Sequence, residues 1–317
     1  MNILEVKDLT IYNKNNKILL NKINFVLPYG KTLGIAGESG SGKTLLGQSI
    51  TGLLDKEIFE IKKGQIFYRN ENILRNDNNL VRNLRGKKIS MIFQEPMLSL
   101  NPVLTVQTQI EEIIKLHLTN ERIKIDKLTK DILVQVGLLN IEKILKSYPH
   151  MLSGGQRQRV MIAIAIVCNP DILIADEPTT ALDVTLQIQI LDLLKSLKEI
   201  KKMSLIFISH DLDLLKNYAD YILILKNGAV IENATSKDIF NNPQEKYTKE
   251  LLESSPKRLV NKAPYTDLLL ETKKLGCKFL IKNSFFEKKK KYFTALNNIN
   301  IQIRKGETVG IVGESGS

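Results

Sequence analysis

The sequence predicts an α/β protein whose core is a mostly parallel β-sheet flanked by helices. Three observations support this fold class. Short apolar runs typical of buried strands alternate with helical stretches, a glycine-rich loop joins one such strand to a helix, and part of the pattern recurs near the C-terminus. The 317 residues are 43% apolar and 25% charged, so the chain can bury a sizeable core.

Apolar periodicity and turn residues predict the elements in order. Strands are predicted at residues 4–11, 18–27, 32–36, 88–93, 172–176 and 205–209, and helices at 44–54 and 182–201. Residues 103–152 have a mainly helical pattern, which indicates a helical subdomain inserted into the sheet domain. Alternation of strands and helices favours a parallel sheet covered on both faces.

An internal repeat divides the chain. Residues 21–41 recur at 297–317 without a gap, and 12 of the 21 aligned positions are identical. We therefore expect a complete domain at residues 1–255, a linker at 256–267, and at 268–317 the truncated N-terminal part of a second copy.

Charge and hydropathy limit the partners. The formal net charge is +12, but the lysines are scattered among Asn and Ile, so we expect biased composition and no nucleic-acid partner, with attraction to an anionic membrane surface as the alternative. The longest strictly apolar run, residues 160–168, is far shorter than the roughly 20 residues of a membrane span. The N-terminus lacks a signal-peptide pattern, so a cytosolic chain is expected. Cys168 and Cys277 stand alone and predict neither a disulfide nor a metal cluster.

The segment Gly37-Glu-Ser-Gly-Ser-Gly-Lys-Thr44 fits the phosphate-loop pattern G-x-x-x-x-G-K-[ST] between a predicted strand and a predicted helix. In such a loop the backbone N–H groups converge on phosphate oxygens, here those of Gly37, Ser39, Gly40, Ser41 and Gly42. Lys43 supplies a cation for the outer phosphates, and the Thr44 hydroxyl can ligate Mg2+. The motif predicts a nucleoside triphosphate site, and its context disfavours an ordinary Gly-Ser turn.

Two adjacent acids end a predicted buried strand in Ile172-Leu-Ile-Ala-Asp-Glu-Pro178. Because ionised carboxylates are costly to bury without partners, this placement favours chemistry over a merely solvated strand end. We expect Asp176 to hold the Mg2+ shell and Glu177 to act as general base toward the attacking water.

A second candidate anion cradle lies in Leu152-Ser-Gly-Gly-Gln-Arg-Gln-Arg159, at the start of a long apolar helix. Its candidate ligands are Ser153, Gly154, Gly155 and Gln156. Two cradles on one chain suggest that two copies meet and complete each other's sites. In this order, the LSGGQ segment and the Asp-Glu strand resemble the signature and catalytic motifs of ABC ATPases.

The resemblance implies further roles and an architecture with an antiparallel β-subdomain beside the core sheet. Gln94 resembles the glutamine that contacts Mg2+ and senses the membrane partner, and Asp183 resembles the D-loop residue at the dimer interface. His210 resembles the switch histidine at the γ-phosphate. Tyr12 matches the aromatic residue that stacks on adenine in this family. The alternative is an ordinary tyrosine on an edge strand. Phe279 is expected to be the counterpart of Tyr12 in the repeat. ATP and Mg2+ are the implied ligands.

Three longer segments, residues 94–102, 178–184 and 243–251, resemble the oligopeptide, dipeptide and nickel importer branch. The tandem layout and Tyr148-Pro-His150 resemble the fused two-ATPase subunits of the microcin C type. The resemblance implies permease subunits as partners, a second ATPase domain (homodimer or paralogue), an indirect solute-binding protein, and a place on the cytoplasmic face of the cell membrane. The chain departs from the family in its shortened second copy and in lacking the cysteine-rich tail of some single-domain members.

Two other functions stay open at this point. One is a soluble ABC ATPase acting on ribosomes or DNA, which the positive charge favours. The other is a non-functional gene fragment, which the shortened second copy favours.

Overall fold

The computed structural model describes residues 1–74, 78–180, 182–253, 267–281 and 291–313. Contacts divide the chain into two units, Met1–Ser255 and Pro256–Ser317. The linker expected at 256–267 lies almost wholly outside the described residues, as do the last four residues of the repeated glycine-rich loop.

Unit 1 is built on a six-stranded sheet. In spatial order its strands are β10 (Ala229–Thr235), β9 (Tyr221–Lys226), β3 (Thr32–Ala36), β8 (Ser204–Ile208), β7 (Ile172–Asp176) and β6 (Ile89–Ile92). All neighbouring pairs are parallel except β9 and β10. Because the parallel strands share one direction, the loops that follow β3, β6, β7 and β8 meet at the same edge of the sheet.

Helices pack on both faces of this sheet. Helices that contact its strands include α1 (Lys43–Thr51), α7 (Gly154–Ile166) and α9 (Leu212–Tyr218), and α8 (Val184–Lys201) packs against α7. Along β7 the buried side chains alternate: Ile174 belongs to the same core cluster as Leu46 of α1, whereas Leu173 belongs to the cluster that contains Ile162 of α7. The sheet is therefore buried on both sides, as the continuous apolar strands predict.

An antiparallel sheet of four strands lies beside the core. Its order is β2 (Ile18–Pro28), β1 (Asn2–Asn13), β4 (Phe59–Tyr68) and β5 (Glu71–Asn72). The Tyr68 hydroxyl donates a hydrogen bond to Asp171, and Arg69 lies 2.9 Å from the same carboxylate. Since Asp171 directly precedes β7, this contact ties the antiparallel sheet to the amino ends of the core strands.

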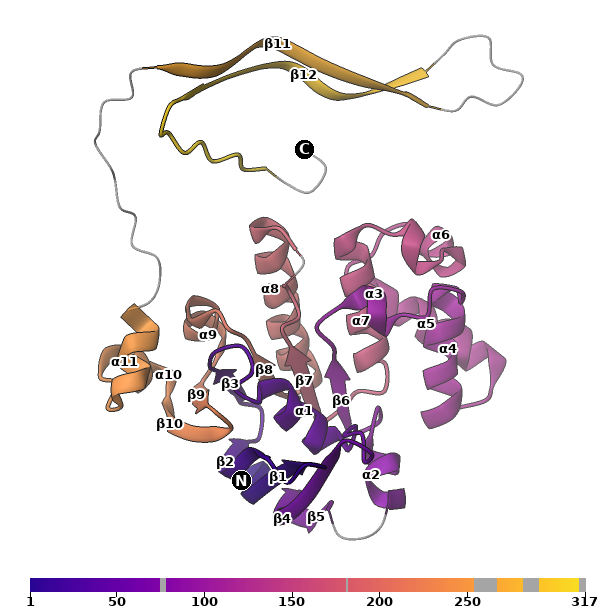
Figure 1. Cartoon of the computed structure of the whole chain (residues 1–317). Coiled ribbons are helices and arrows are strands. Elements are labelled where there is room, and N and C mark those ends of the chain that lie inside the picture. The colour runs from indigo at the N-terminus through magenta and orange to yellow at the C-terminus, as the bar shows by residue number, and fades with distance from the viewer. Residues whose placement is uncertain (75–77, 181, 254–266, 282–290, 314–317) are drawn as a thin grey trace. The chain divides into compact units, whose positions relative to one another are not determined.

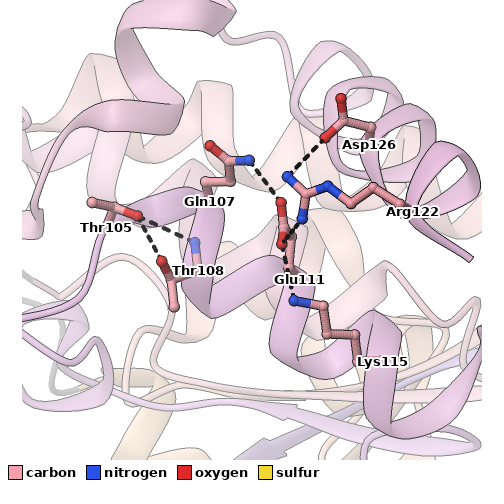
Figure 2. A network of polar contacts seen from close by, with 7 residues as sticks. All are labelled: Thr105, Gln107, Thr108, Glu111, Lys115, Arg122 and Asp126. Carbon is pink, nitrogen blue, oxygen red and sulfur yellow. Dashed lines mark hydrogen bonds and ion pairs between the residues drawn. The ribbon is translucent and has the colours of Figure 1, made fainter. Parts of the chain in front are cut away.

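A group of helices lies to one side of the core sheet (Figure 1). After the short α2 (Asn78–Leu84) and α3 (Pro96–Ser99), it contains α4 (Val106–His117), α5 (Arg122–Gln135) and α6 (Ile141–Lys146), followed by a 3-10 turn at Pro149–Met151. Figure 2 shows the polar network that joins two of these helices. The buried carboxylate of Glu111 on α4 accepts hydrogen bonds from Gln107 at 2.7 Å, Lys115 at 3.1 Å and Arg122 of α5 at 2.8 Å.

Two short helices end unit 1, α10 (Ser236–Asn241) and α11 (Lys246–Glu253). Within the described part of the chain, no helix combines the length and hydrophobicity needed to span a bilayer.

The predicted elements are recovered with shifted ends. Strands β3 and β7 have the predicted bounds, because fully buried strands show as unbroken apolar runs. Helix α1 ends at Thr51 and not at residue 54, because Gly52 adopts a left-handed conformation (φ 64°) that closes the helix. Helix α8 begins at Val184 and not at residue 182, because the Asp183 side chain caps it by accepting from Leu186 N–H at 2.9 Å.

The described part of unit 2 is a hairpin of β11 (Leu268–Ile281) and β12 (Lys291–Arg304). It repeats local details of the β1–β2 hairpin. Lys274 N–H donates to Asn300 Oδ1 at 2.8 Å, as Asp8 N–H donates to Asn24 Oδ1 at 2.9 Å, and Lys274 and Asp8 both have positive φ. The repeat seen in the sequence is therefore also a repeat in backbone conformation.

The strand register corrects one expectation. Thr294 is the counterpart of Ile18 in the repeat, and it pairs with Lys278, just as Ile18 pairs with Tyr12. Lys278 therefore occupies the position of Tyr12, and the equivalence of Phe279 with Tyr12 was wrong. Phe279 lies one residue further along the strand, and a shift of one residue points a side chain to the other face of a sheet.

Candidate functional site

The phosphate loop connects β3 to α1 and is shaped by glycines. Gly37 has φ +148°, and a Cβ there would lie 2.1 Å from the carbonyl oxygen of Leu225, at the end of β9. Gly42 has φ +101°, and a Cβ there would lie 2.5 Å from the Leu20 side chain. A residue with a side chain fits neither position without displacing its neighbours, so the loop keeps its backbone exposed toward the start of α1.

The Lys43 side chain is folded back onto this loop. Its ammonium donates to the carbonyl oxygens of Gly37 at 2.8 Å and Glu38 at 2.9 Å, and the residue is only 6% exposed. Burial lowers the pKa of Lys43, and the nearby carboxylates of Glu177 and Asp176 oppose that shift. The buried Ser41 hydroxyl has no hydrogen-bond partner among the described residues. A buried cation and an unsatisfied hydroxyl on one loop fit a phosphate group.

Asp176 ends β7 in a site suited to a divalent cation. It is 2% exposed, and its Oδ1 atom has no hydrogen-bond partner within the described residues. Burial raises the pKa of Asp176, and the charge of Glu177 also raises it. The Thr44 hydroxyl and Lys43 lower the pKa and so oppose part of this shift. A cation held by one carboxylate, one hydroxyl and substrate phosphates matches the preference of Mg2+, so these residues fit it. The described residues hold no cluster of three or more His, Cys, Asp or Glu that could bind a metal by itself.

Glu177 is the meeting point of three loops. Its Oε1 lies 3.1 Å from Nδ1 of His210, which follows β8, and its Oε2 accepts a hydrogen bond from Gln94 Nε2 at 3.1 Å, in the loop after β6. The Thr180 hydroxyl donates to the Glu177 carbonyl oxygen at 2.8 Å and lies 3.2 Å from Oε2. Glu177 has a positive φ of 45°, a conformation uncommon for a residue with a side chain and often found at functional sites.

The structure thus brings together three residues that the sequence predicted separately, Gln94, Glu177 and His210. A small hollow of about 180 Å³ is bounded by residues that include Glu177 and His210. Thr180 was missed by sequence reasoning, although its position three residues after Glu177 is typical of a hydroxyl that bonds back to the preceding turn.

The LSGGQ segment forms a capped helix start. The Ser153 hydroxyl accepts from the N–H of Gln156 at 3.3 Å, and the Gln156 side chain accepts from Ser153 N–H at 3.0 Å, a reciprocal capping box. Gly155 is buried, and a Cβ there would lie 2.7 Å from Leu186 of α8. Within the described chain, no hydrogen bond or ion pair links this turn to the phosphate loop, so the two anion cradles are separate.

Two further predicted site residues lie apart from these contacts. Asp183 caps α8, while the neighbouring Ala181 lies outside the described residues. The half-buried ring of Tyr12 has the Lys62 ammonium 4.7 Å from its centroid, so a cation covers one face of the ring.

A larger hollow of about 680 Å³ lies elsewhere. It is bounded by the C-terminal end of α1 and by β4, and it contains none of the predicted site residues. The chemistry described above is therefore carried by the loops at the carboxyl ends of the strands and not by this larger space.

Comparisons with known proteins agree with the geometry. The family profile described as ABC transporter matches residues 20–180. The chain is 40% identical to the "Peptidoglycan transport ATP-binding protein YejF" of Agrobacterium fabrum, over 99% of this chain and 58% of that protein. It is 44% identical to the "Oligopeptide transport ATP-binding protein AppD" of Bacillus subtilis, over 80% of this chain and 78% of that protein. The chain thus spans less than two thirds of the first of these relatives.

Solved structures show the same fold. A structure of cbiO1 from Clostridium perfringens, part of the ABC transporter complex cbiONQ, has a TM-score of 0.67 and 28% identity, covering 76% of this chain and 91% of that one. A dimeric structure of the ATP-binding cassette MJ0796 bound to ADP and Pi has a TM-score of 0.65 and 28% identity, covering 74% of this chain and 98% of that one.

Proposed function

The chain belongs to the ABC transporter family of ATP-binding proteins, and on that basis we propose that it hydrolyses ATP to power a transporter that imports peptides. The observation that carries this proposal is the convergence of Gln94, Glu177 and His210 beside the buried pair of Lys43 and Asp176. A nucleotide loop, a cation site and a candidate base are the parts that phosphoryl transfer to water requires.

Each residue has a role in the proposed hydrolysis. Lys43 leaves the carbonyl oxygens of Gly37 and Glu38 and pairs with the outer phosphates, for which its charge is more favourable than for neutral carbonyls. Thr44 and Asp176, with Gln94, would hold Mg2+, and such a cation would neutralise the phosphate charge. Glu177 accepts the proton of the attacking water, and His210 holds the carboxylate and reaches the γ-phosphate.

A second ATPase domain is proposed to complete the site. The Ser153–Gln156 turn and the phosphate loop of one chain are separate, so the turn is available to the nucleotide of a partner domain. The dimeric arrangement of the similar MJ0796 cassette supports this pairing. The partner domain is a second copy of this chain or a paralogue, and Asp183 lies at the interface.

The transport partners follow from the same proposal. Gln94 begins a segment that carries Met97 and Val103 as exposed apolar side chains, a surface suited to a membrane permease. The chain then acts on the cytoplasmic face of the cell membrane, with a solute-binding protein as an indirect partner. The names of the similar proteins, which include oligopeptide and peptidoglycan transport, support a peptide-like solute.

The test has two parts. The purified chain should hydrolyse MgATP, with activity rising more than linearly with protein concentration because two domains share each site. The tagged chain should also co-purify with integral membrane proteins after detergent extraction. Absence of hydrolysis at any concentration, also with a full-length relative as partner, would overturn the enzymatic part; co-purification with ribosomes or DNA would overturn the transport part.

A further inference from the structure

The hollow of about 680 Å³ lies at the end of α1 that is remote from the phosphate loop. Helix α1 begins at Lys43 in that loop and ends at Thr51, and nine helical residues separate its two ends by roughly 13 Å. Gly52, which closes the helix, bounds the hollow together with residues of β4 and α2. Its volume lies within the range usual for small-molecule sites.

Positive charge dominates the walls of this hollow. Six basic residues bound it: Lys14, Lys56, Lys62, Lys63, Arg82 and Arg85. Among the described residues around it Glu60 is the one acid, and its carboxylate lies 3.8 Å from the Lys62 ammonium. Within the described part of the chain, no carboxylate forms an ion pair with Lys63, Arg82 or Arg85. Like charges gathered around one cavity attract an anion into it.

Arg85 is held in place by neutral groups. Its Nε donates to the Thr51 carbonyl oxygen at 2.9 Å, and its Nη2 donates to the Gly52 carbonyl oxygen. A guanidinium has five N–H donors, and these two carbonyls do not neutralise its charge. Arg85 therefore keeps both its charge and further donors for an anion. Lys43 is held by two carbonyl oxygens in the same way at the phosphate loop.

Arg82 lies on the same side of the chain as Arg85. The Arg85 N–H donates to the Val81 carbonyl oxygen at 3.0 Å, so the helical turn of α2 continues to this residue. Residues three apart on such a turn face the same way, and both arginines bound the hollow. Burial lowers the pKa of Arg85, and the charge of Arg82 lowers it further. An anion bound between the two guanidinium groups would relieve this repulsion.

The other part of the wall is apolar. Phe59 and Ile61 of β4 and Val81 of α2 bound the hollow and are only partly buried against the core. An inorganic anion would leave these side chains without contact, whereas an organic group attached to the anion would cover them.

We propose that this hollow is a binding site for a small organic phosphate, whose phosphate group is held by Lys63, Arg82 and Arg85 and whose organic group packs on Phe59 and its apolar neighbours. A phosphate monoester carries nearly two negative charges at neutral pH and offers three acceptor oxygens, which suits several cations and the planar fork of arginine. The site is independent of the proposed ATP hydrolysis, because none of these residues belongs to the phosphate loop or to the contacts around Glu177.

The first experiment titrates phenyl phosphate into the whole chain by calorimetry, with saturating MgAMP-PNP present so that the phosphate loop is occupied. Phenyl phosphate should bind, and its affinity should fall as salt is added. Phenol and inorganic phosphate should each bind more weakly, because each lacks one half of the probe. Absence of binding by phenyl phosphate would overturn the proposal, and inorganic phosphate that binds equally well would overturn its organic part.

The second experiment locates the site with charge reversals. Lys63 and Arg82 are exposed, so Lys63→Glu with Arg82→Glu should fold and should lower the affinity for phenyl phosphate by at least roughly ten-fold. Lys127→Glu with Lys237→Glu is the matched control, since both lysines are exposed, neither bounds the hollow, and the change in net charge is the same. The control should bind as the wild type does. Equal losses in the two double variants, or no loss in the first, would overturn the proposal.

Arg85→Lys tests the contribution of the fixed guanidinium, because Lys keeps the charge but not the fork of donors. Its affinity for phenyl phosphate should fall several-fold, and its unfolding temperature is measured in parallel because Arg85 also holds the end of α1. Wild-type affinity in this variant would overturn the role assigned to Arg85.

Discussion

Glu177 Oε1 lies 3.1 Å from Nδ1 of His210, and this contact joins the ends of two adjacent core strands. Gln94 holds the other carboxylate oxygen at 3.1 Å, so the Glu177 side chain has a fixed direction although its backbone is in an uncommon conformation. Because both of its oxygens are held, this carboxylate can accept a proton without first changing its side-chain conformation.

Replacing Glu177 with Gln should therefore lower ATP turnover at least about a hundredfold, the usual scale for a lost general base. The amide has nearly the same shape, so nucleotide affinity should remain within a few-fold of wild type. Phosphate release under saturating MgATP measures the first effect, and filter binding of labelled ATP measures the second. Turnover close to that of the wild type would show that another group activates the water.

Ser153→Arg should abolish hydrolysis while leaving nucleotide binding largely intact, because Ser153 is proposed to act on the nucleotide of a partner domain. This variant also removes the helix cap, which costs about 1 kcal/mol. Ser153→Asp separates the two effects, since Asp caps helices as well as Ser does but places a negative charge toward phosphate. Both variants should be inactive, and only the Arg variant should melt at lower temperature. Loss of nucleotide binding in the Asp variant would argue against sharing of the site between domains.

The local parts of the site could be predicted from the sequence, whereas contacts across the sheet could not. The run from Gly37 to Thr44 has a fixed spacing, and its strand–loop–helix context can be seen in the sequence. Thr180 was not found because its contact with Glu177 depends on a turn conformation, which leaves no periodic signal in the sequence. The Lys62 side chain over Tyr12 depends on strand register, which irregular pairing shifts.

The same limit explains the error at Phe279. The residue numbers of aligned positions in the second strands of the two hairpins differ by a constant offset. The loop that joins the two strands has a different length in each hairpin, so that offset does not apply to the first strands. The counterpart of Tyr12 therefore follows from the pairing of Lys278 with Thr294.

Asp176→Asn should make the nucleotide-free protein more stable while removing its response to Mg2+. The folded state holds this carboxylate with a raised pKa, so its charge weakens folding once the pH exceeds the ordinary pKa of Asp, and the penalty is complete once the pH exceeds the folded value. Asn removes the charge at similar volume, and we expect a gain of about 1–3 kcal/mol at pH 8 that disappears in acid. Chemical denaturation at pH 8 and pH 4, with and without MgCl2 and ADP, measures it. A less stable Asn variant at pH 8 would mean that Lys43 already compensates the charge.

Glu111→Gln should weaken the contact between α4 and α5 at neutral pH and have little effect in acid. Burial alone would raise the pKa of Glu111, but hydrogen bonds from Gln107, Lys115 and Arg122 lower it overall. A lowered pKa in the folded state stabilises the protein above the ordinary pKa of Glu, and this stabilisation is lost as the pH falls through the folded value. The expected loss is about 1–2 kcal/mol at pH 7.

The control for Glu111 is Glu250→Gln, which disrupts only an exposed pair with Lys246 at 3.6 Å and should change stability much less. Urea unfolding from pH 3 to pH 8 compares the two variants. A loss for Glu111→Gln that does not depend on pH would show that shape and not charge holds the helices together.

Gly155→Ala should destabilise unit 1 because the added methyl group overlaps the side chain of Leu186. The new Cβ would lie 2.7 Å from that side chain, and overpacking of this kind costs about 1–3 kcal/mol. Gly154→Ala is the matched control, since its Cβ would meet Leu182 at an ordinary 3.6 Å. The double variant Gly155→Ala with Leu186→Ala removes the overlap, so the two changes should be less damaging together than the sum of their separate effects. Additive losses would mean that the backbone of α7 shifts away from α8, in which case the single variant should also disturb the capping box at Ser153 and reduce hydrolysis.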